Sequence, residues 1–206
     1  MAMNPAAEDA GCEPAGAVFL DKDGTLLEDV PYNVDPARMR FAPGVPSGLR
    51  RLAALGVPLV VVSNQPGLAL GLFEEAALQA MQSHLRRMFA DAGAALTAFY
   101  YCPHHPDGTV APFACACRCR KPDSGMLERA AREHGLSLAR SWLIGDILDD
   151  VEAGRRAGCR TVLLDNGNET QWRPGALRVP QHMAADFDEA ASYVAQWMAA
   201  RSRSHA

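Results

Sequence analysis

The sequence predicts an α/β domain built on a doubly wound parallel sheet with helices on both faces. Three observations lead to this expectation. Short apolar runs alternate with segments of helical periodicity, and repeated strand–helix units favour a parallel sheet. Several of the apolar runs end abruptly in polar residues. The composition, 49% hydrophobic and 21% charged over 206 residues, is typical of one soluble globular domain.

The expected elements follow one another in alternation. Each strand is a short apolar run bounded by turn residues, as in buried parallel strands. We expect strands at residues 18–20, 57–63, 96–101, 142–144 and 161–164. We expect helices at residues 48–55, 74–92, 124–134, 148–157 and 187–198. The longest helix has a stripe of core residues at helical spacing, and Gly135 closes the third helix in the position of a C-cap.

The chain is expected to form a single domain over residues 15–200. Residues 1–14 are small, polar and acidic, so we expect a disordered leader, and residues 201–206 a frayed tail. The leader lacks the basic start and apolar centre of a signal peptide, and no apolar run reaches the roughly 18 residues of a membrane span. A net charge of −4 disfavours nucleic acid as a partner but permits small phosphates. We therefore expect a cytoplasmic monomer with no membrane partner.

Two aspartates stand directly after the first predicted strand. Asp21 and Asp23 are one residue apart and are followed by Gly24 and Thr25. Open α/β sheets place their active sites at the carboxyl ends of strands. There, one carboxylate can coordinate Mg²⁺ and attack phosphorus, while a second donates and accepts a proton. The alternative for this motif alone is an ordinary Asx-type turn.

Three further motifs with reactive side chains fit the same chemistry. Ser63 and Asn64 end the second strand and can hold phosphate oxygens. Arg120 and Lys121 place positive charge just before a helix, where Lys121 can neutralise phosphate and carboxylates. Asp146, with Asp150 four residues later, adds the carboxylates that a hard divalent cation requires. Each motif alone could be a loop or a helix cap, but the four together predict phosphoryl transfer.

With these motifs, residues 17–164 resemble the haloacid dehalogenase-like (HAD) phosphohydrolase superfamily, which has a Rossmann-like sheet. The resemblance implies that Asp21 is the nucleophile and forms an aspartyl-phosphate. Asp23 would be the general acid for the leaving group and then the base for water. Mg²⁺ would be held by Asp21, the backbone carbonyl of Asp23, and Asp146.

The same resemblance implies roles for the remaining polar residues of these motifs. Ser63 and Lys121 would clasp the transferred phosphoryl group. Asp150 would order Lys121 or a metal-bound water. Asn64 and Arg120 are expected to contact the substrate, with Arg120 reaching a distal phosphate or a sugar hydroxyl.

The loop over residues 102–119 contains two close pairs of soft metal ligands. These are Cys102 with His104 and Cys117 with Cys119, while His105 and Cys115 are further candidates. Three thiolates and one imidazole suit a closed, tetrahedral, structural Zn²⁺ site. The alternative is a chance cluster of unpaired cysteines. A zinc-clipped loop would be held rigid despite its length, and it would position the basic pair that follows it.

The sequences around both ligand pairs, residues 101–106 and 117–122, resemble the signature of the D-glycero-D-manno-heptose 1,7-bisphosphate 7-phosphatases. The related histidinol-phosphate phosphatases have a similar loop. The resemblance implies the zinc ligands Cys102, His104, Cys117 and Cys119, and no large cap domain. It implies a Mg²⁺-dependent phosphomonoesterase that removes the 7-phosphate of the heptose bisphosphate, in lipopolysaccharide precursor synthesis. The alternatives are histidinol phosphate, another small metabolite, or a catalytically silent binding protein.

Two positions depart from the pattern of the heptose enzymes. Leu70 stands where they usually have Arg, and Ile147 where they usually have Lys. Both changes remove positive charge from the expected site and leave the hydrolytic residues intact. Without a large cap, substrate choice would fall to the loops over residues 28–36, 65–73 and 102–120. Residues 166–170 either line the mouth of the site or form a plain polar turn.

Overall fold

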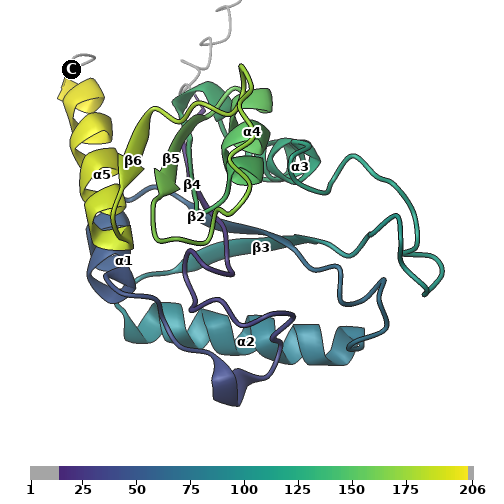
Figure 1. Cartoon of the computed structure of the whole chain (residues 1–206). Helices are drawn as coiled ribbons and strands as arrows, with labels where there is room; N and C mark the ends of the chain where they lie inside the picture. The colour runs from purple at the N-terminus through teal and green to yellow at the C-terminus, as the bar shows by residue number, and fades with distance from the viewer. Residues whose placement is uncertain (1–13, 204–206) are drawn as a thin grey trace, which may run out of the picture.

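The fold is an α/β sandwich around one parallel sheet, seen here in a computed structural model that describes residues 14–203 (Figure 1). The expected leader, up to residue 13, and the last three residues of the expected tail lie outside the described part. Six strands form the sheet in the order β3-β2-β1-β4-β5-β6, all parallel. They are β1 Val18–Leu20, β2 Leu59–Asn64, β3 Leu96–Cys102, β4 Trp142–Gly145, β5 Arg160–Leu164 and β6 His182–Ala184.

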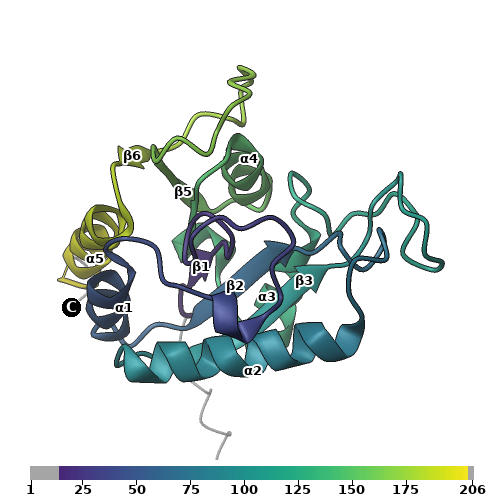
Figure 2. The same ribbon diagram turned by 60° about the horizontal axis from the view of Figure 1, so that its bottom comes forward.

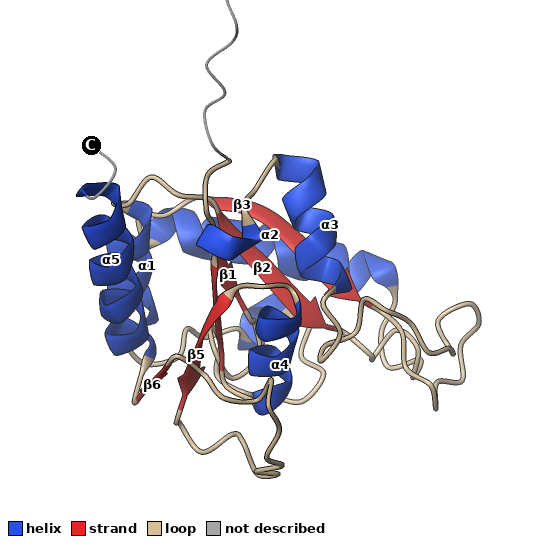
Figure 3. Ribbon diagram, turned by 90° about the horizontal axis from the view of Figure 1, so that it is seen from above, coloured by secondary structure: helices blue, strands red, loops and turns tan. Residues whose placement is uncertain are grey.

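Five α-helices cover both faces of the sheet (Figures 2 and 3). They are α1 Val45–Ala53, α2 Glu75–Asp91, α3 Gly125–His134, α4 Leu148–Arg156 and α5 Phe187–Arg203, with short 3₁₀ turns at Pro36–Arg38 and Leu138–Arg140. The side chains of β1 alternate between the faces, as the two-residue period of a strand requires. Val18 and Leu20 pack in the cluster formed with α1, α2 and α5, whereas Phe19 packs with α3. The predicted doubly wound fold is confirmed, and residues 14–203 include no cap domain.

Most element boundaries lie within two residues of the prediction, and three differences are larger. Helix α1 begins at Val45, before the expected start at residue 48, because Pro46 is tolerated in a first helical turn. Strand β6 was not expected, since only three residues pair there and one of them, Met183, is exposed. Helix α5 continues to Arg203, so the expected tail from residue 201 begins within a helix.

The sheet order places β1 between β2 and β4. Leu20 is in register with Val61 and Ile144, so the loops after all three strands leave the same edge of the sheet. Of the helices in the described range, none is long and apolar enough to cross a bilayer.

Candidate active site

Polar residues that follow β1 and β4 and those that end β2 line one cavity of about 220 Å³. Its lining residues are Asp21, Asp23, Asp29, Ser63, Asn64, Lys121, Asp146, Ile147 and Asn168. The order of the strands brings these residues together although they lie far apart in sequence. Of the residues expected in the phosphate site, Arg120 and Asp150 are absent from this lining.

Lys121 is the buried cation of the site. Its Nζ lies 2.5 Å from Asp21 Oδ1 and 2.5 Å from Asp150 Oδ1, and it donates to the carbonyl oxygen of Val62 at 3.0 Å. Burial by itself lowers the pKa of this ammonium, but the charges of Asp150 and Asp21 outweigh burial and raise it. Lys121 therefore stays charged, and Asp150 pairs with it directly.

Asp146 is a buried carboxylate in a crowded anionic environment. It accepts hydrogen bonds from Thr25 Oγ1 at 3.0 Å and from Asn168 Nδ2 at 2.9 Å. Burial, followed by the charges of Asp21 and Asp150, raises the pKa of Asp146 to about 8. Carboxylate oxygens of Asp21, Asp146 and Asp150 lie within 4.8 Å of one another. Such a cluster is most stable when a cation is bound or a proton is taken up.

The donor set fits a hard divalent cation. Four carboxylates and two ammonium groups are in contact here: Asp21, Asp23, Asp146 and Asp150 with Lys22 and Lys121. This group has two negative charges in excess, and Asp29 adds a further carboxylate to the cavity lining. Lys121 already occupies Asp150, so the carboxylates of Asp21 and Asp146 are the ones that can hold Mg²⁺.

Position 24 requires a glycine, because its backbone packs closely against the side chains of Asp146 and Asn168. Its φ of +78° is left-handed, and a Cβ there would lie 2.1 Å from Asp146 Oδ2 and 2.5 Å from Asn168 Nδ2. Asn166 and Asn168 both donate to the carbonyl of Gly24, at 2.8 and 3.3 Å. The loop after β5 therefore forms part of the site, which decides between the two readings of residues 166–170.

Lys22 and Gln65, which the sequence did not mark as site residues, bind the carboxylate of Asp23. Lys22 is fully buried, and its Nζ lies 2.6 Å from Asp23 Oδ1. Gln65 donates from Nε2 to Asp23 Oδ2 at 3.1 Å and to Ser63 Oγ at 2.8 Å. A lysine between two aspartates is ordinarily exposed, so its pairing was not visible in the sequence. Burial raises the pKa of Asp23, although Lys22 acts in the opposite direction.

We expect Lys22→Met to impair proton transfer by Asp23, because it removes the 2.6 Å ion pair that orients this carboxylate. The turnover of alkyl phosphates should fall by roughly 100-fold, the usual range for a misplaced general acid. Phosphates with good leaving groups, such as p-nitrophenyl phosphate, need little protonation, so their first step should be slowed less. Rapid-mix measurement of nitrophenol release checks this, and Lys22→Arg should restore part of the loss. If the rates for alkyl phosphates and for p-nitrophenyl phosphate fell equally, the substitution would have disrupted the active site as a whole and not proton transfer by Asp23.

The structure shows how Asn64 and Arg120 lie within the protein, and their expected contacts with substrate stay predictions. Both polar atoms of the Asn64 side chain bind the backbone of Lys121: Oδ1 accepts from its N–H at 3.0 Å, and Nδ2 donates to its carbonyl at 3.1 Å. Asn64 thus holds Lys121 in place, although it also lines the cavity. Arg120 lies outside the cavity lining, and its Nη1 is buried without a partner among the described residues.

The raised pKa of Asp146 predicts a stability that depends on pH and on Mg²⁺. A carboxyl with a pKa near 3.8 in the unfolded chain and about 8 in the fold binds more protons when folded. Without Mg²⁺, stability should therefore fall as pH rises from about 4 through 8. Mg²⁺ should restore it, and the increase in Tm on adding Mg²⁺ should grow over the same range. Thermal unfolding at pH 5 and 8.5 measures this. In Asp146→Asn, the melting temperature should depend less on pH, and Mg²⁺ should no longer raise it. If Mg²⁺ raised the melting temperature of the wild type equally at both pH values, Asp146 would not be the group responsible.

The second cluster lies at the end of β3 and in the loop that follows. Sγ of Cys102 is 3.4 Å from Sγ of Cys117 and 3.2 Å from Sγ of Cys119, and His104 Nδ1 is 3.3 Å from Cys119 Sγ. A tetrahedral zinc site has edges of roughly 3.4–3.8 Å, so the four atoms are spaced to hold one ion. The hydrogen bond between Cys102 and Cys119 lowers the pKa of Cys119 to about 5 and raises the pKa of Cys102. The thiolate, the form that binds zinc, is thereby favoured at Cys119.

The structure separates these four ligands from the two further candidates. Cys115 is exposed, with its Sγ 3.7 Å from the carbonyl oxygen of Pro112. Nδ1 of His105 accepts from the backbone N–H of Asp107 at 3.2 Å. Neither residue belongs to the cluster of close ligand atoms.

Comparisons with known proteins agree with this geometry. Residues 118–190 match the HAD-hydrolase-like family. A D-glycero-β-D-manno-heptose-1,7-bisphosphate 7-phosphatase of Yersinia pestis is 40% identical over 148 residues, which cover 72% of this chain and 79% of the relative. A D-glycero-α-D-manno-heptose-1,7-bisphosphate 7-phosphatase of Photorhabdus laumondii is 33% identical over 153 residues, covering 74% of this chain and 84% of the relative. The crystal structure of a D,D-heptose 1,7-bisphosphate phosphatase from B. bronchiseptica, complexed with magnesium and phosphate, matches with a TM-score of 0.76. It is 32% identical, and the match covers 88% of this chain and 99% of that one.

Proposed function

Because the chain belongs to the family of D-glycero-D-manno-heptose-1,7-bisphosphate 7-phosphatases, which are HAD-like phosphatases, we propose that it hydrolyses the 7-phosphate of such a heptose bisphosphate. The observation that carries the proposal is the shared cavity in which Lys121 bridges Asp21 and Asp150 beside Asp23 and Asp146. Phosphoryl transfer needs an in-line nucleophile, charge neutralisation and positioning, and each has a residue here.

The first step of the reaction uses Asp21 and Asp23. A carboxylate oxygen of Asp21 attacks phosphorus, the P–O bond to C7 of the sugar breaks, and an aspartyl-phosphate forms on Asp21. Asp23, whose pKa is raised by burial, gives its proton to the departing sugar oxygen. In the second step, Asp23 takes a proton from water as that water attacks the phosphorus. Inorganic phosphate leaves, and Asp21 is regenerated.

Charge neutralisation is the task of the surrounding residues. Lys121 is oriented by Asp150 and by the backbone clamp of Asn64, so its ammonium is in place before substrate arrives. Ser63 offers its hydroxyl to a phosphoryl oxygen. Mg²⁺, held by Asp21, the carbonyl of Asp23, and Asp146, would supply further positive charge to the phosphoryl oxygens.

The zinc site has a structural role in this proposal. Zn²⁺ held by Cys102, His104, Cys117 and Cys119 would tie the end of β3 to the segment that leads into Lys121. Four protein ligands leave no open position for a reacting water. The site therefore fixes a loop and takes no part in hydrolysis.

The test is phosphate release with Mg²⁺ from both anomers of the heptose bisphosphate, histidinol phosphate, common hexose phosphates and nucleotides. We expect one anomer of the bisphosphate to give a kcat/KM at least about 10-fold above every other compound. ³¹P NMR of the product would show the anomeric phosphate retained and the 7-phosphate lost. A different preferred substrate would overturn the substrate assignment. Size-exclusion chromatography would test the prediction that the protein is a monomer. Cell fractionation would test the prediction that it is cytoplasmic.

A further inference from the structure

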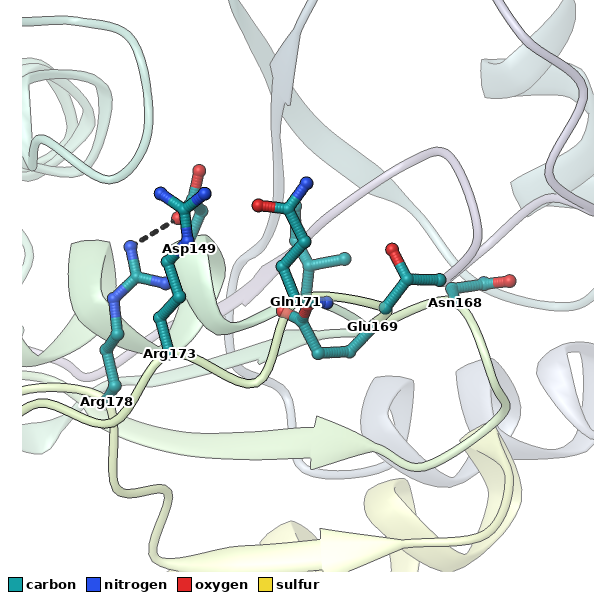
Figure 4. Close-up of a pocket in the computed structure, with 8 residues that line it drawn as sticks. Asp149, Asn168, Glu169, Gln171, Arg173 and Arg178 are labelled. Atoms are coloured by element: carbon teal, nitrogen blue, oxygen red, sulfur yellow. Dashed lines mark hydrogen bonds and ion pairs between the residues drawn. The ribbon is translucent and has the colours of Figure 1, made fainter.

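Amide side chains contact several of the reacting residues of the catalytic cavity. Asn168, which also lines a neighbouring cavity of about 270 Å³ (Figure 4), donates to Asp146 at 2.9 Å. Gln65 is the amide that contacts Asp23 and Ser63. Unlike Asn168, Gln65 does not line the catalytic cavity, whereas both of its partners do. Any effect of the Gln65 side chain on the reaction must therefore pass through these two partners.

The Gln65 side chain uses one nitrogen for both contacts. Its Nε2 lies 3.1 Å from Asp23 Oδ2 and 2.8 Å from Ser63 Oγ, so each of its two N–H groups has its own acceptor. Gln65 is only 3% exposed, which keeps water away from both hydrogen bonds. The amide therefore holds a carboxylate oxygen and a hydroxyl oxygen at a fixed separation.

The contact with Gln65 decides how the hydroxyl of Ser63 is used. A hydroxyl has one donor and two acceptor positions. Ser63 Oγ accepts from Gln65, and within residues 14–203 no acceptor binds the hydrogen of this hydroxyl. The O–H of Ser63 is therefore left to donate into the cavity that Ser63 lines, where a phosphoryl oxygen would accept it.

The carboxyl group of Asp23 is fixed at both of its oxygens. Lys22 Nζ pairs with Oδ1 at 2.6 Å, and Gln65 binds Oδ2. Two donors at different oxygens define the orientation of the carboxyl plane, and this orientation sets the direction of proton transfer. Without Gln65, the Oδ2 atom could turn about the ion pair with Lys22.

The backbone of Gln65 is anchored to the sheet. Its N–H donates to the carbonyl oxygen of Cys102 at 2.8 Å, directly after the last paired position of β2 and β3. Cys102 is also one of the four expected zinc ligands. Gln65 is thus held by a rigid strand end, as a residue that positions others must be.

We propose that Gln65 is a positioning residue for both steps of the reaction, directing Asp23 Oδ2 toward the proton that it transfers and the Ser63 hydroxyl toward the phosphoryl group. This inference rests on the proposed function, because that reaction uses Asp23 first as an acid and then as a base. A good leaving group such as p-nitrophenolate departs with little help from an acid. In the second step, water must always give a proton to Asp23 as its oxygen attacks phosphorus and the P–O bond to Asp21 breaks.

The experiment measures the two steps separately with p-nitrophenyl phosphate and Mg²⁺. Rapid mixing gives the rate of nitrophenol release in the first turnover, and steady-state phosphate release gives the overall rate. In Gln65→Met, which keeps the length of the side chain and loses both N–H groups, we expect the ratio of the first rate to the second to rise about 10- to 100-fold. Mass spectrometry of quenched enzyme should show a matching increase in the fraction phosphorylated on Asp21.

Two further variants separate positioning from simple filling of space. Gln65→Glu has the same shape but offers acceptors where the amide offers donors, so it should raise the ratio at least as much as Gln65→Met. Gln79→Met makes the same change at an exposed position of α2 outside the cavity and should keep the wild-type ratio. Melting temperatures show whether each variant is folded, and Gln65→Glu provides the test if Gln65→Met is not.

An unchanged ratio in the Gln65 variants, or an equal fall in both rates, would overturn the positioning role and leave the proposed function standing. A rise of the same size in Gln79→Met would also overturn it. If the wild type formed no aspartyl-phosphate, the proposed reaction and the role of Gln65 would fall together. If the wild type turned over p-nitrophenyl phosphate through Asp21 but not the heptose bisphosphate, only the substrate assignment would be lost.

Discussion

Asp21→Asn is expected to abolish phosphate release, lowering kcat by at least about 1,000-fold for every substrate the enzyme accepts. The amide has nearly the shape of the carboxylate but cannot attack phosphorus, so no aspartyl-phosphate forms. Lys121 loses one of its two carboxylate partners and keeps Asp150 at 2.5 Å, so the surrounding structure should persist. Steady-state phosphate release, with mass spectrometry of quenched enzyme for the phosphorylated residue, measures the effect.

The matched control for this variant is Asp91→Asn, at the exposed end of α2 and outside the catalytic cavity. It makes the same chemical change and should keep wild-type activity. The melting temperature of Asp21→Asn should stay close to that of the wild type, since its loss of an ion pair is offset by less repulsion among the buried carboxylates. If Asp21→Asn kept more than a few per cent of the activity, the nucleophile would have to be another residue.

Removing zinc should unfold part of the protein, whereas removing Mg²⁺ should stop turnover and leave the fold intact. Cys119 has close contacts with three other ligand atoms of the cluster, so Cys119→Ser should release the metal. We expect the melting temperature to fall by about 10 °C, as for the loss of several kcal/mol in a domain of this size. Zinc content by atomic emission and thermal unfolding by circular dichroism are the measurements.

Cys115→Ser is the control for the zinc experiment, because Cys115 is exposed and lies outside the cluster. It should keep both the zinc and the wild-type melting temperature. Chelation of Mg²⁺ alone should abolish turnover and change the circular dichroism spectrum very little. Equal unfolding on loss of either metal would contradict this division between a structural and a catalytic ion.

The sequence alone determined the features of this protein that depend on local pattern. Apolar runs and helical periodicity located strands β1 to β5 and helices α1 to α5, because each period reflects which face of an element is buried. The position of Asp21, Ser63 and Asp146 at strand ends was enough to predict that they would meet, since parallel strands end at one edge of the sheet. The two close ligand pairs, Cys102 with His104 and Cys117 with Cys119, could be predicted because the members of each pair are only two positions apart in the sequence.

Only the tertiary structure decided how the remaining residues are used. Lys22 pairs with Asp23 because it is fully buried beside β1, a placement that its own charge argues against in sequence. Asn168 reaches Gly24, 144 positions away, since the sheet order brings the loop after β5 over the loop after β1. Asn64 turned out to clamp Lys121, a contact across 57 positions. Residue type shows which chemistry a side chain can perform, but its partners depend on distances between elements that only the packed fold defines.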